Sequence, residues 1–414
     1  MIRLTIFGAI IAVFLYTYLD GNVPEPIPEQ FKVKIIDAGM KTYGLTIGTM
    51  VSLGITDPLS DLDRKFADHV ILLLTTGFPW GLGVDPDLKI SDRTMNGVHV
   101  RMYEPMTSLP VSERPALVYF HGGGWSLLSV DSYDPLMRKI AKASGVVVIS
   151  VNYRLSPQYP YPVPLQDCHD VVEYVIENCA SLNIHPNKIA IGGDSAGGNI
   201  AAAISYKLKH KIALQFLLVP VLQMANWNTK SYIENAPYLS KSINSPDSIC
   251  FVLNYLNLDY KYTRDFLNNN HTSAAFKASD YMDLIDQNRW LPQQFVRDKT
   301  LMSKLETRTD FGDEELFSII ESRITDPMVS PLLARDDMLK GLPLTYIATS
   351  GYDVIRDDGI MYSERLKHVG QKVIHQHYSE AFHNSLFFAG GPLKLEVGER
   401  IVQDIVDTLK DKLL

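Results

Sequence analysis

The chain has 414 residues, of which 46% are hydrophobic, and a formal net charge of −8. A chain of this length can bury a full core, and its acidic excess argues against a surface that binds nucleic acid. Its three cysteines form an odd, sparse set, which is typical of a reducing compartment.

An uncharged, mostly apolar run spans residues 4–19, between Arg3 and Asp20. As a helix it would measure about 24 Å, close to the thickness of the thin endoplasmic-reticulum bilayer. The basic residue before the run and the acids after it favour translocation of the C-terminal body. Three closely spaced prolines follow and no small-x-small cleavage site does, so we favour an uncleaved anchor over a cleaved signal peptide. We therefore predict a signal-anchor transmembrane segment over residues 1–20, single-pass type II topology, and a body in the endoplasmic-reticulum lumen.

The segment after the anchor, residues 21–90, is predicted to be a largely helical cap or linker region, and residues 91–414 an α/β core. Core strands are expected at short apolar runs, because parallel strands are covered on both faces. These runs are residues 98–102, 116–120, 146–151, 188–191, 212–219, 344–349 and 372–378. They predict a mostly parallel sheet of roughly eight strands with helices on both faces.

Two glycine-rich motifs directly follow predicted strands. Residues 121–125 read His-Gly-Gly-Gly-Trp, and residues 193–197 read Gly-Asp-Ser-Ala-Gly. In the second motif Ser195 stands between a strand and a helix, which is the context of a nucleophile elbow. Its neighbours must be small because the turn is tight. Either motif alone is weak, but together they predict that Ser195 is a nucleophile.

A serine that attacks a carbonyl group generates an oxyanion, which preorganised backbone N–H groups must face. Ala196, directly after the serine, offers one such group. The glycine loop offers others, because glycine lets backbone donors approach without a Cβ. We predict an oxyanion hole lined by Gly122, Gly123, Gly124 and Ala196, in which Gly123 and Gly124 donate and Gly122 shapes the turn.

Residues 222–330 interrupt the βα alternation and are rich in Asn, Tyr and Phe, so we predict a cap insertion there. Four of its aromatic residues are candidate walls of an acyl pocket, although cap packing alone explains any one of them: Trp227, Tyr232, Phe251 and Trp290. Asn270 begins an Asn-His-Thr sequon, which is a glycosylation site only if the body enters the lumen.

The remaining catalytic groups should follow the serine in the order acid, then histidine. Asp353 lies closest to the end of the predicted strand 344–349. Asp357 and Asp358 fall at the start of the next predicted helix, where acids complement the helix dipole. His383 follows the last predicted strand. We predict Asp353 as the acid and His383 as the base, with Asp357 as the alternative acid.

Three other histidines need an interpretation. His375 and His377 alternate along one predicted strand, but no further residue has a spacing that would complete a metal site. His121 is expected to shape its loop rather than to act as a base. The sequence therefore predicts no metal and no cofactor.

Together with Asn-Tyr-Arg-Leu-Ser-Pro at 152–157 and the stretch 352–359, these motifs resemble the hormone-sensitive-lipase-like branch of the α/β-hydrolases. The arrangement is most similar to the arylacetamide deacetylase and neutral cholesterol ester hydrolase group, over nearly the whole chain. The resemblance implies an α/β-hydrolase fold with a helical cap and a triad of Ser195, Asp353 and His383. It also implies hydrolysis of apolar carboxylic esters, from lipids or xenobiotics, or of aryl amides.

The chain departs from the group at one pair of positions. Members often carry two cysteines where this chain has Ser126 and Ser350. If residues 164–180 are one helix, Cys168 and Cys179 lie roughly 16 Å apart along its axis. A disulfide requires Cα atoms within about 7 Å. We therefore predict a lumenal enzyme without the bridge of the group.

One alternative belongs to a different class of function. Some proteins of this fold have lost catalysis and bind small molecules or act in adhesion. A serine, an acid and a histidine all stand where the fold requires them, which favours the enzyme. The sequence leaves open whether the substrate is a lipid or a xenobiotic, and it leaves the oligomeric state open.

Overall fold

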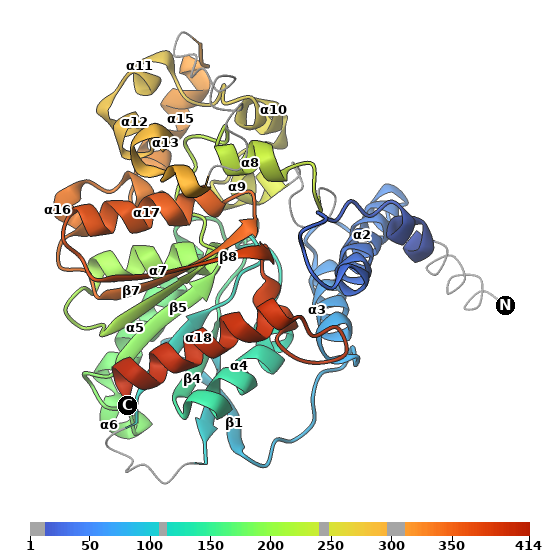
Figure 1. The fold of residues 1–414 in the computed structure, drawn as a ribbon, viewed down its shortest axis with the longest axis vertical. Coiled ribbons are helices and arrows are strands. Elements are labelled where there is room, and N and C mark those ends of the chain that lie inside the picture. Colours follow the sequence, from blue (N-terminus) through green and yellow to red (C-terminus); the bar gives the residue numbers. More distant parts are fainter. Residues whose placement is uncertain (1–12, 107–113, 240–247, 296–310) are drawn as a thin grey trace.

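The computed structural model describes residues 13–106, 114–239, 248–295 and 311–414. Within these residues eight strands form one sheet in the order β1-β2-β4-β3-β5-β6-β7-β8 (Figure 1). Their bounds are β1 Leu88–Met95, β2 Val98–Pro105, β3 Ala116–Phe120, β4 Val147–Asn152, β5 Ile189–Asp194, β6 Leu214–Leu218, β7 Leu344–Tyr352 and β8 Val373–Phe382. The β1–β2 and β2–β4 pairs are antiparallel and the other pairs are parallel. The predicted mostly parallel sheet is confirmed.

Successive side chains of the strands point to opposite faces of the sheet, and helices cover both faces. Leu117 of β3 belongs to one buried cluster and Val118 to the other. The Leu117 face is covered by α4 (Val130–Ser144) and α18 (Glu396–Leu413). The Val118 face is covered by α5 (Val163–Glu177), α7 (Ala196–Lys207) and α17 (Arg356–His368). Figure 1 shows α4 and α18 side by side across the sheet.

The interval between β6 and β7 carries the cap at one end of the sheet (Figure 1). Its helices are α8 Lys230–Asn235, α9 Ile249–Tyr255, α10 Thr263–Leu267, α11 Ala274–Lys277, α12 Asp280–Leu284, α13 Gln287–Trp290 and α15 Glu314–Ile324. The 3-10 turn Pro331–Leu333 and the short helix α16 (Asp336–Leu339) then lead into β7. Most of the predicted insertion 222–330 is therefore helical.

Two helices, α2 (Gln30–Ser52) and α3 (Asp61–Thr76), occupy the predicted helical region after the anchor. Ser60 caps α3 by accepting the backbone N–H of Asp63, and Gly77 ends the helix with a left-handed φ of 80°. Arg64 of α3 donates to the carbonyl oxygen of Ser126, directly after the glycine motif at 121–125. The helix pair is therefore joined to a loop of the predicted site.

The strand prediction missed β1 and set several ends too short. β1 is an edge strand, and several of its side chains are polar and exposed. It therefore has no continuous apolar run. The predicted boundary at residue 91 falls inside this strand. Strand β5 continues to Asp194 and β8 to Phe382, so both strands reach the predicted catalytic turns.

Most of the predicted anchor, residues 1–12 of 1–20, lies outside the described residues. Residues 13–19 are helical, and the Thr17 hydroxyl donates to the carbonyl oxygen of Ala38 on α2. Among the described residues, no helix has the length and apolar character needed to cross a bilayer.

The helix on which the cysteine prediction depended is wrong in one detail. Cys168 lies in α5, whereas Cys179 begins the separate short helix α6 (Cys179–Leu182), because Asn178 interrupts the helix. Both thiols are buried and free.

Candidate active site

The turn that carries Ser195 joins β5 directly to α7. Ser195 has a φ of 53° and a ψ of −119°, a backbone conformation that residues other than glycine rarely adopt. A Cβ at Gly193 or Gly197 would overlap the carbonyl oxygen of Phe120. The Ser195 N–H donates to the Leu218 carbonyl oxygen at 2.9 Å. The glycine-flanked motif therefore forms a strained turn pressed against the neighbouring strands.

The structure brings the three predicted catalytic side chains together. His383 Nε2 lies 3.1 Å from Ser195 Oγ, and His383 Nδ1 lies 2.8 Å from Asp353 Oδ2. Asp353 is fully buried, and its Oδ1 also accepts the backbone N–H of Ile355 at 3.0 Å. Asp353 follows β7 and His383 follows β8, so all three side chains come from turns at the same edge of the sheet.

Burial and the neighbouring carboxylates have opposite effects on the pKa of His383. Burial lowers the pKa of His383, whereas the charge and hydrogen bond of Asp353 raise it, and the charge of Asp194 adds to the rise. The net pKa lies above the ordinary value of 6.5. The carboxylates therefore stabilise a protonated imidazole.

The two competing acids, Asp357 and Asp358, bind elsewhere. Both lie in the first turn of α17, as predicted, and both are buried, with exposed fractions of 0% and 2%. Asp358 accepts the backbone N–H of Leu222 at 3.1 Å, and burial raises its pKa to about 7. Asp357 forms an ion pair with Arg356 at 2.8 Å. Asp357 also accepts the backbone N–H of Ser231 of α8 at 2.7 Å, so each of the two acids ties α17 to a neighbouring segment.

The glycine loop lies next to the serine turn. The Gly122 N–H donates to the hydroxyl of Tyr133 at 2.7 Å, which fits a turn-shaping role. Gly123 and Gly124 have φ values of 103° and 60°, which favour glycine. In the described part of the chain, no backbone hydrogen bond uses the N–H groups of Gly123, Gly124 or Ala196. These three N–H groups are available to a ligand.

Of the four candidate aromatic walls, Phe251 alone has a contact with the glycine loop among those that the structure describes. A Cβ on Gly124 would lie 2.6 Å from its ring. Next to it, Trp125 stacks on Tyr255 of the same helix, α9, with ring centroids 4.3 Å apart. Cap helix α9 therefore covers the loop with aromatic side chains.

The other three candidates pack elsewhere in these contacts. The Trp290 ring meets His368 of α17 edge-on, with centroids 5.3 Å apart. Trp227 and Tyr232 meet each other edge-on at 6.4 Å. Cap packing accounts for these three rings.

The histidines expected to be structural make structural contacts. His121 is fully buried and stacks on Tyr153 with centroids 4.3 Å apart. His375 and His377 both hydrogen-bond to Thr349 Oγ1, at 2.9 and 3.0 Å. None of these contacts joins His121, His375 or His377 to the Ser195 side chain.

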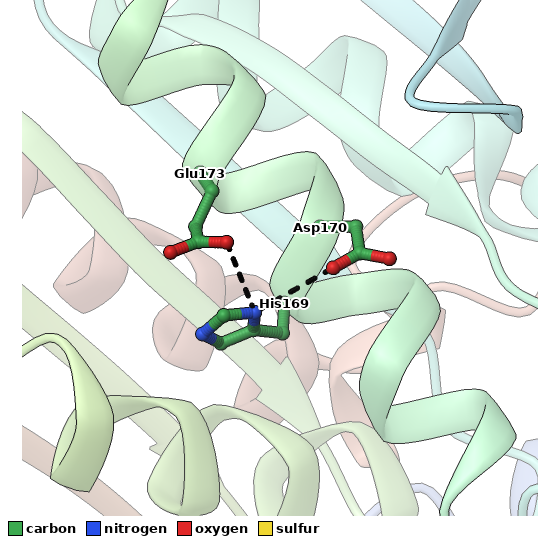
Figure 2. A group of neighbouring side chains, drawn as sticks. All are labelled: His169, Asp170 and Glu173. Atoms are coloured by element: carbon green, nitrogen blue, oxygen red, sulfur yellow. Dashed lines mark ion pairs between the residues drawn. The ribbon is translucent and has the colours of Figure 1, made fainter.

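A different histidine joins the one group of metal-ligating side chains that the described residues bring within reach of one another. His169, Asp170 and Glu173 lie along α5 (Figure 2), and His169 Nδ1 is 3.7 and 3.5 Å from the two carboxylates. The three side chains are half-buried and neighbours on a single helix. This arrangement is explained by helix spacing and ion pairing.

The sequon asparagine, Asn270, lies in an ordered part of the cap. Its side chain is half-buried, and Nδ2 donates to Asp265 Oδ1 at 2.9 Å. The third sequon residue, Thr272, is 1% exposed.

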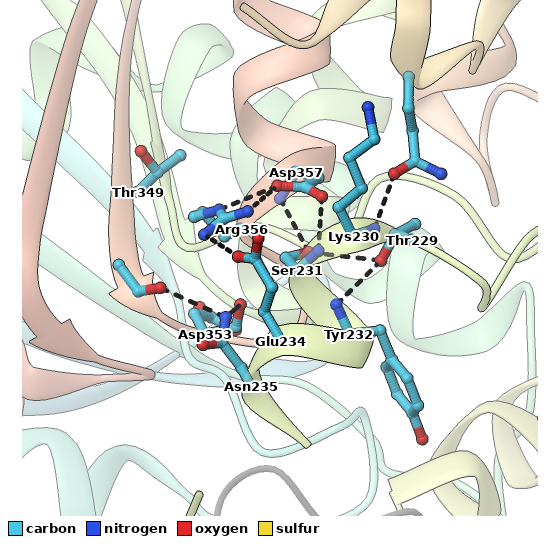
Figure 3. A network of polar contacts seen from close by, with 12 residues as sticks. Thr229, Lys230, Ser231, Tyr232, Glu234, Asn235, Thr349, Asp353, Arg356 and Asp357 are labelled. Carbon is cyan, nitrogen blue, oxygen red and sulfur yellow. Dashed lines mark hydrogen bonds and ion pairs between the residues drawn. The ribbon is translucent and has the colours of Figure 1, made fainter. Parts of the chain in front are cut away.

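Sequence reasoning missed several residues that surround the triad. Asp194 is fully buried beside Ser195 and accepts hydrogen bonds from Tyr119 and Tyr133. On the opposite side, Asn235 of α8 donates to the Asp353 carbonyl oxygen at 2.8 Å (Figure 3). The one signal in the sequence was the acid inside the Gly-Asp-Ser-Ala-Gly motif. The tyrosines and Asn235 come from distant segments.

Comparison with known proteins agrees with this geometry. The profile of a family described as having the alpha/beta hydrolase fold matches residues 117–272 and 282–387. Arylacetamide deacetylase of Bos taurus is 35% identical over 99% of this chain and 98% of the relative. Neutral cholesterol ester hydrolase 1 of Mus musculus is 30% identical, with the same shares covered.

Solved structures extend the agreement to the fold. The hyperthermophilic esterase of Pyrobaculum calidifontis is similar with a TM-score of 0.57 at 24% identity, over 84% of this chain and 92% of that one. A mutant of the esterase E40 is similar with a TM-score of 0.65 at 19% identity, over 94% and 100%. The chain is therefore an enzyme of the α/β-hydrolase family, a hydrolase in the group that includes arylacetamide deacetylase and neutral cholesterol ester hydrolase.

Proposed function

We propose that this protein is a serine hydrolase that cleaves carboxylic esters of small-to-medium apolar compounds through an acyl-enzyme on Ser195. The observation that carries the proposal is the unbroken hydrogen-bond chain from Asp353 through His383 to Ser195. Beside it lie three backbone N–H groups that no backbone acceptor uses in the described residues. A nucleophile, a base, an orienting acid and oxyanion donors are the groups that acyl transfer needs.

In the first step, Ser195 Oγ bonds to the carbonyl carbon of the substrate while His383 Nε2 takes the hydroxyl proton. The carbonyl oxygen becomes an oxyanion that the N–H groups of Gly123, Gly124 and Ala196 face. Asp353 accepts the Nδ1–H of the imidazole, which fixes the tautomer and stabilises the imidazolium.

In the second step, the tetrahedral intermediate collapses and the bond to the leaving alcohol or amine breaks. That group takes the proton from His383, and the acyl group stays on Ser195. A water molecule then repeats the attack, His383 again moves the proton, and the acid is released. These steps use only the named side chains, the backbone N–H groups and water.

The substrate class follows from the lining and from the relatives. Phe251 covers the glycine loop, which favours an apolar acyl or aryl group there. One relative is named for arylacetamides and another for cholesterol esters. We include lipid esters, xenobiotic esters and aryl amides in the proposed range. A silent binding or adhesion role is disfavoured, because such a role needs no hydrogen-bonded triad.

We further propose that residues 1–20 anchor the enzyme to the endoplasmic-reticulum membrane, with the body in the lumen. The apolar run at 4–19 supports this, as does the distribution of exposed apolar side chains. Of the eighteen large apolar side chains exposed in the described part of the chain, thirteen lie between residues 15 and 84. A concentration of this kind suits a membrane surface.

Glycosylation of Asn270 belongs to the same topological proposal. The Nδ2 atom to which a glycan would be attached donates to Asp265, and Thr272 is buried. Modification would therefore have to precede folding of this segment.

The experiment for the function replaces Ser195 with alanine and follows turnover of paired ester and amide substrates of increasing acyl length. We expect ester turnover to fall roughly 10⁴- to 10⁶-fold. Ser205→Ala is the matched control, because Ser205 is a fully buried serine of α7, the helix that follows Ser195. Undiminished turnover in Ser195→Ala with the fold intact would contradict the proposal. The substrate profile decides between lipid esters and aryl amides.

The experiment for the topology uses sealed microsomes. The body should resist added protease, stay with the membrane after a carbonate wash, and lose mass with glycosidase if Asn270 is modified. Digestion of the body in intact vesicles would contradict the lumenal placement.

A further inference from the structure

One tyrosine of α4 contacts the loops that carry the proposed catalytic groups. The hydroxyl of Tyr133 lies 2.7 Å from Asp194 Oδ2, next to Ser195, and 2.7 Å from the backbone nitrogen of Gly122. Its ring meets Phe387 edge-on with centroids 4.7 Å apart. Phe387 lies in the 3-10 turn Ser385–Phe388, which follows the histidine loop. Tyr133 therefore joins the serine turn, the glycine loop and the histidine loop.

The proton positions in this network follow from the chemistry of its members. A backbone N–H of Gly122 can only donate, so the Tyr133 oxygen accepts, and the Tyr133 hydroxyl donates its own proton to Asp194. The hydroxyl of Tyr119 donates to the other oxygen of Asp194 at 2.8 Å. A fully buried carboxylate thus receives one hydroxyl proton on each oxygen. Burial raises the pKa of Asp194, whereas these two hydrogen bonds oppose that rise and favour the charged form.

The glycine loop rests directly on this carboxylate. A Cβ at Gly122 would overlap Asp194 Oδ2 and would lie 2.9 Å from the Tyr133 hydroxyl. Because the N–H of Gly122 is used by Tyr133, the direction of the peptide plane before Gly122 is fixed. The next two N–H groups, of Gly123 and Gly124, remain for the oxyanion. An error in the first peptide would be carried into both of them.

We infer that Tyr133 and Asp194 are positioning residues that hold the glycine loop at the distance from Ser195 that the oxyanion requires. The inference rests on the proposed function, because it concerns the oxyanion of the Ser195 reaction. Neither side chain touches the substrate. Asp194 is joined to the nucleophile by the chain, and the Tyr133 hydroxyl transmits its position to Gly122.

The chain offers a matched set of tyrosine-to-phenylalanine variants. Tyr133→Phe removes the link between Asp194 and Gly122 and keeps the ring. Tyr119→Phe removes a donor to the same carboxylate and leaves that link intact. Tyr103→Phe is the control, since Tyr103 is also fully buried and its hydroxyl donates at 3.0 Å to Asp134 of the same helix, α4.

The readouts separate positioning from loss of folded protein. Active sites are first titrated with a fluorophosphonate, and kcat and KM are then measured per active site on a short-chain p-nitrophenyl ester. The inhibition constant of a trifluoromethyl ketone is measured in parallel, because its serine adduct carries an oxyanion. Loss of one oxyanion donor costs about 10²–10³ in kcat.

For Tyr133→Phe, which misplaces donors rather than deleting one, we expect kcat to fall about 10- to 100-fold with KM changed less than about threefold. The inhibition constant should rise by a similar factor, because transition-state analogues depend on the same contacts. The kcat of Tyr119→Phe should fall less than that of Tyr133→Phe, and the kcat of Tyr103→Phe should stay within about twofold of wild type.

A Tyr133→Phe enzyme with wild-type kcat and inhibition constant per active site would overturn the inference. Equal losses in Tyr133→Phe and Tyr103→Phe would also overturn it, because they would indicate a general effect of α4. If Tyr133→Phe does not fold, Asp194→Asn is measured in the same way, with the same two outcomes. Ser195→Ala separates the two proposals. Activity that remains in Ser195→Ala would contradict the proposed function. An inactive Ser195→Ala enzyme together with a fully active Tyr133→Phe enzyme would contradict only this inference.

Discussion

The two sides of the site are held in different ways. On the serine side, residues of the core fix the turn: the hydroxyls of Tyr119 and Tyr133 both donate to the buried carboxylate of Asp194. On the acid side, a cap helix fixes the turn: Asn235 of α8 donates to the carbonyl oxygen of Asp353 (Figure 3). The turn of the proposed nucleophile is therefore held by the sheet and α4, and the turn of the proposed acid by the cap.

The acid side is also tied to the cap through charge. Arg356 forms ion pairs with Asp357 at 2.8 Å and with Glu234 of α8 at 3.0 Å, and these side chains are at most 4% exposed. Ser231 of α8 donates its backbone N–H to Asp357 at 2.7 Å (Figure 3). Breaking a buried ion pair is strongly destabilising. We therefore expect changes in the cap to affect turnover through Asp353 and His383, and changes in α4 to affect it through the oxyanion.

The largest effect should separate the two acids of this side. Asp353→Asn should lower turnover by about four orders of magnitude, because the imidazole would adopt the wrong tautomer. Asp357→Asn should instead lower the free energy of unfolding, by less than the about 3–5 kcal/mol that a wholly unpaired buried charge costs, because Arg356 keeps its ion pair with Glu234. Steady-state kinetics and denaturant unfolding of both variants measure this ranking. A greater loss of turnover per folded molecule in Asp357→Asn would make Asp357 the acid.

A smaller effect should follow from the cap clamp. Asn235→Ala removes the donor to the Asp353 carbonyl oxygen, and we expect kcat to fall about tenfold, the equivalent of one buried hydrogen bond of ~1.4 kcal/mol. Asn254→Ala is the control, since Asn254 is a buried asparagine of cap helix α9 that accepts from Tyr260. Equal kcat values for the two variants would indicate that α8 does not position the acid.

Both sides of the site should affect the pH dependence of turnover through His383. Burial lowers the pKa of His383, but Asp353 and, after it, Asp194 raise it above 6.5. The base must be neutral, so kcat/KM should fall as the pH drops through a midpoint above 6.5. Removing a carboxylate charge lowers the imidazole pKa, so the midpoint should move to lower pH in Asp194→Asn and farther in Asp353→Asn. A midpoint that is unchanged in both variants would contradict this electrostatic account.

The smallest effect is expected from reduction. Cys168 and Cys179 are free, so dithiothreitol should barely change the thermal midpoint. Loss of a native disulfide from a small secreted domain typically costs 2–5 kcal/mol, which calorimetry would detect as a clear drop. Such a drop would indicate a bridge that this account lacks.

The sequence was sufficient to locate the three proposed catalytic residues, because they stand where predicted strands end. Ser195 and Asp353 directly follow the buried strands β5 and β7, His383 directly follows the edge strand β8, and parallel strands bring such turns to one edge. The apolar runs also located the parallel strands. They did not locate β1, because an edge strand with exposed polar side chains has no apolar run.

The supports of the triad could not be predicted, because their partners are distant in the sequence. Asp357 receives a hydrogen bond from Ser231, 126 residues away, so its burial depends on how the cap folds back. Tyr133 reaches Asp194 across 61 residues, and in the sequence it is one more aromatic residue of an amphipathic helix. Local patterns predict the catalytic turns, whereas tertiary packing decides what holds them.

The most direct test of the central claim is the site at which a covalent inhibitor binds. The full-length enzyme is treated with a fluorophosphonate, digested, and analysed by tandem mass spectrometry. We expect one adduct, on the peptide that contains Ser195, with labelling abolished in Ser195→Ala and strongly slowed in His383→Ala. An adduct on another residue, or labelling that persists in Ser195→Ala, would contradict the account.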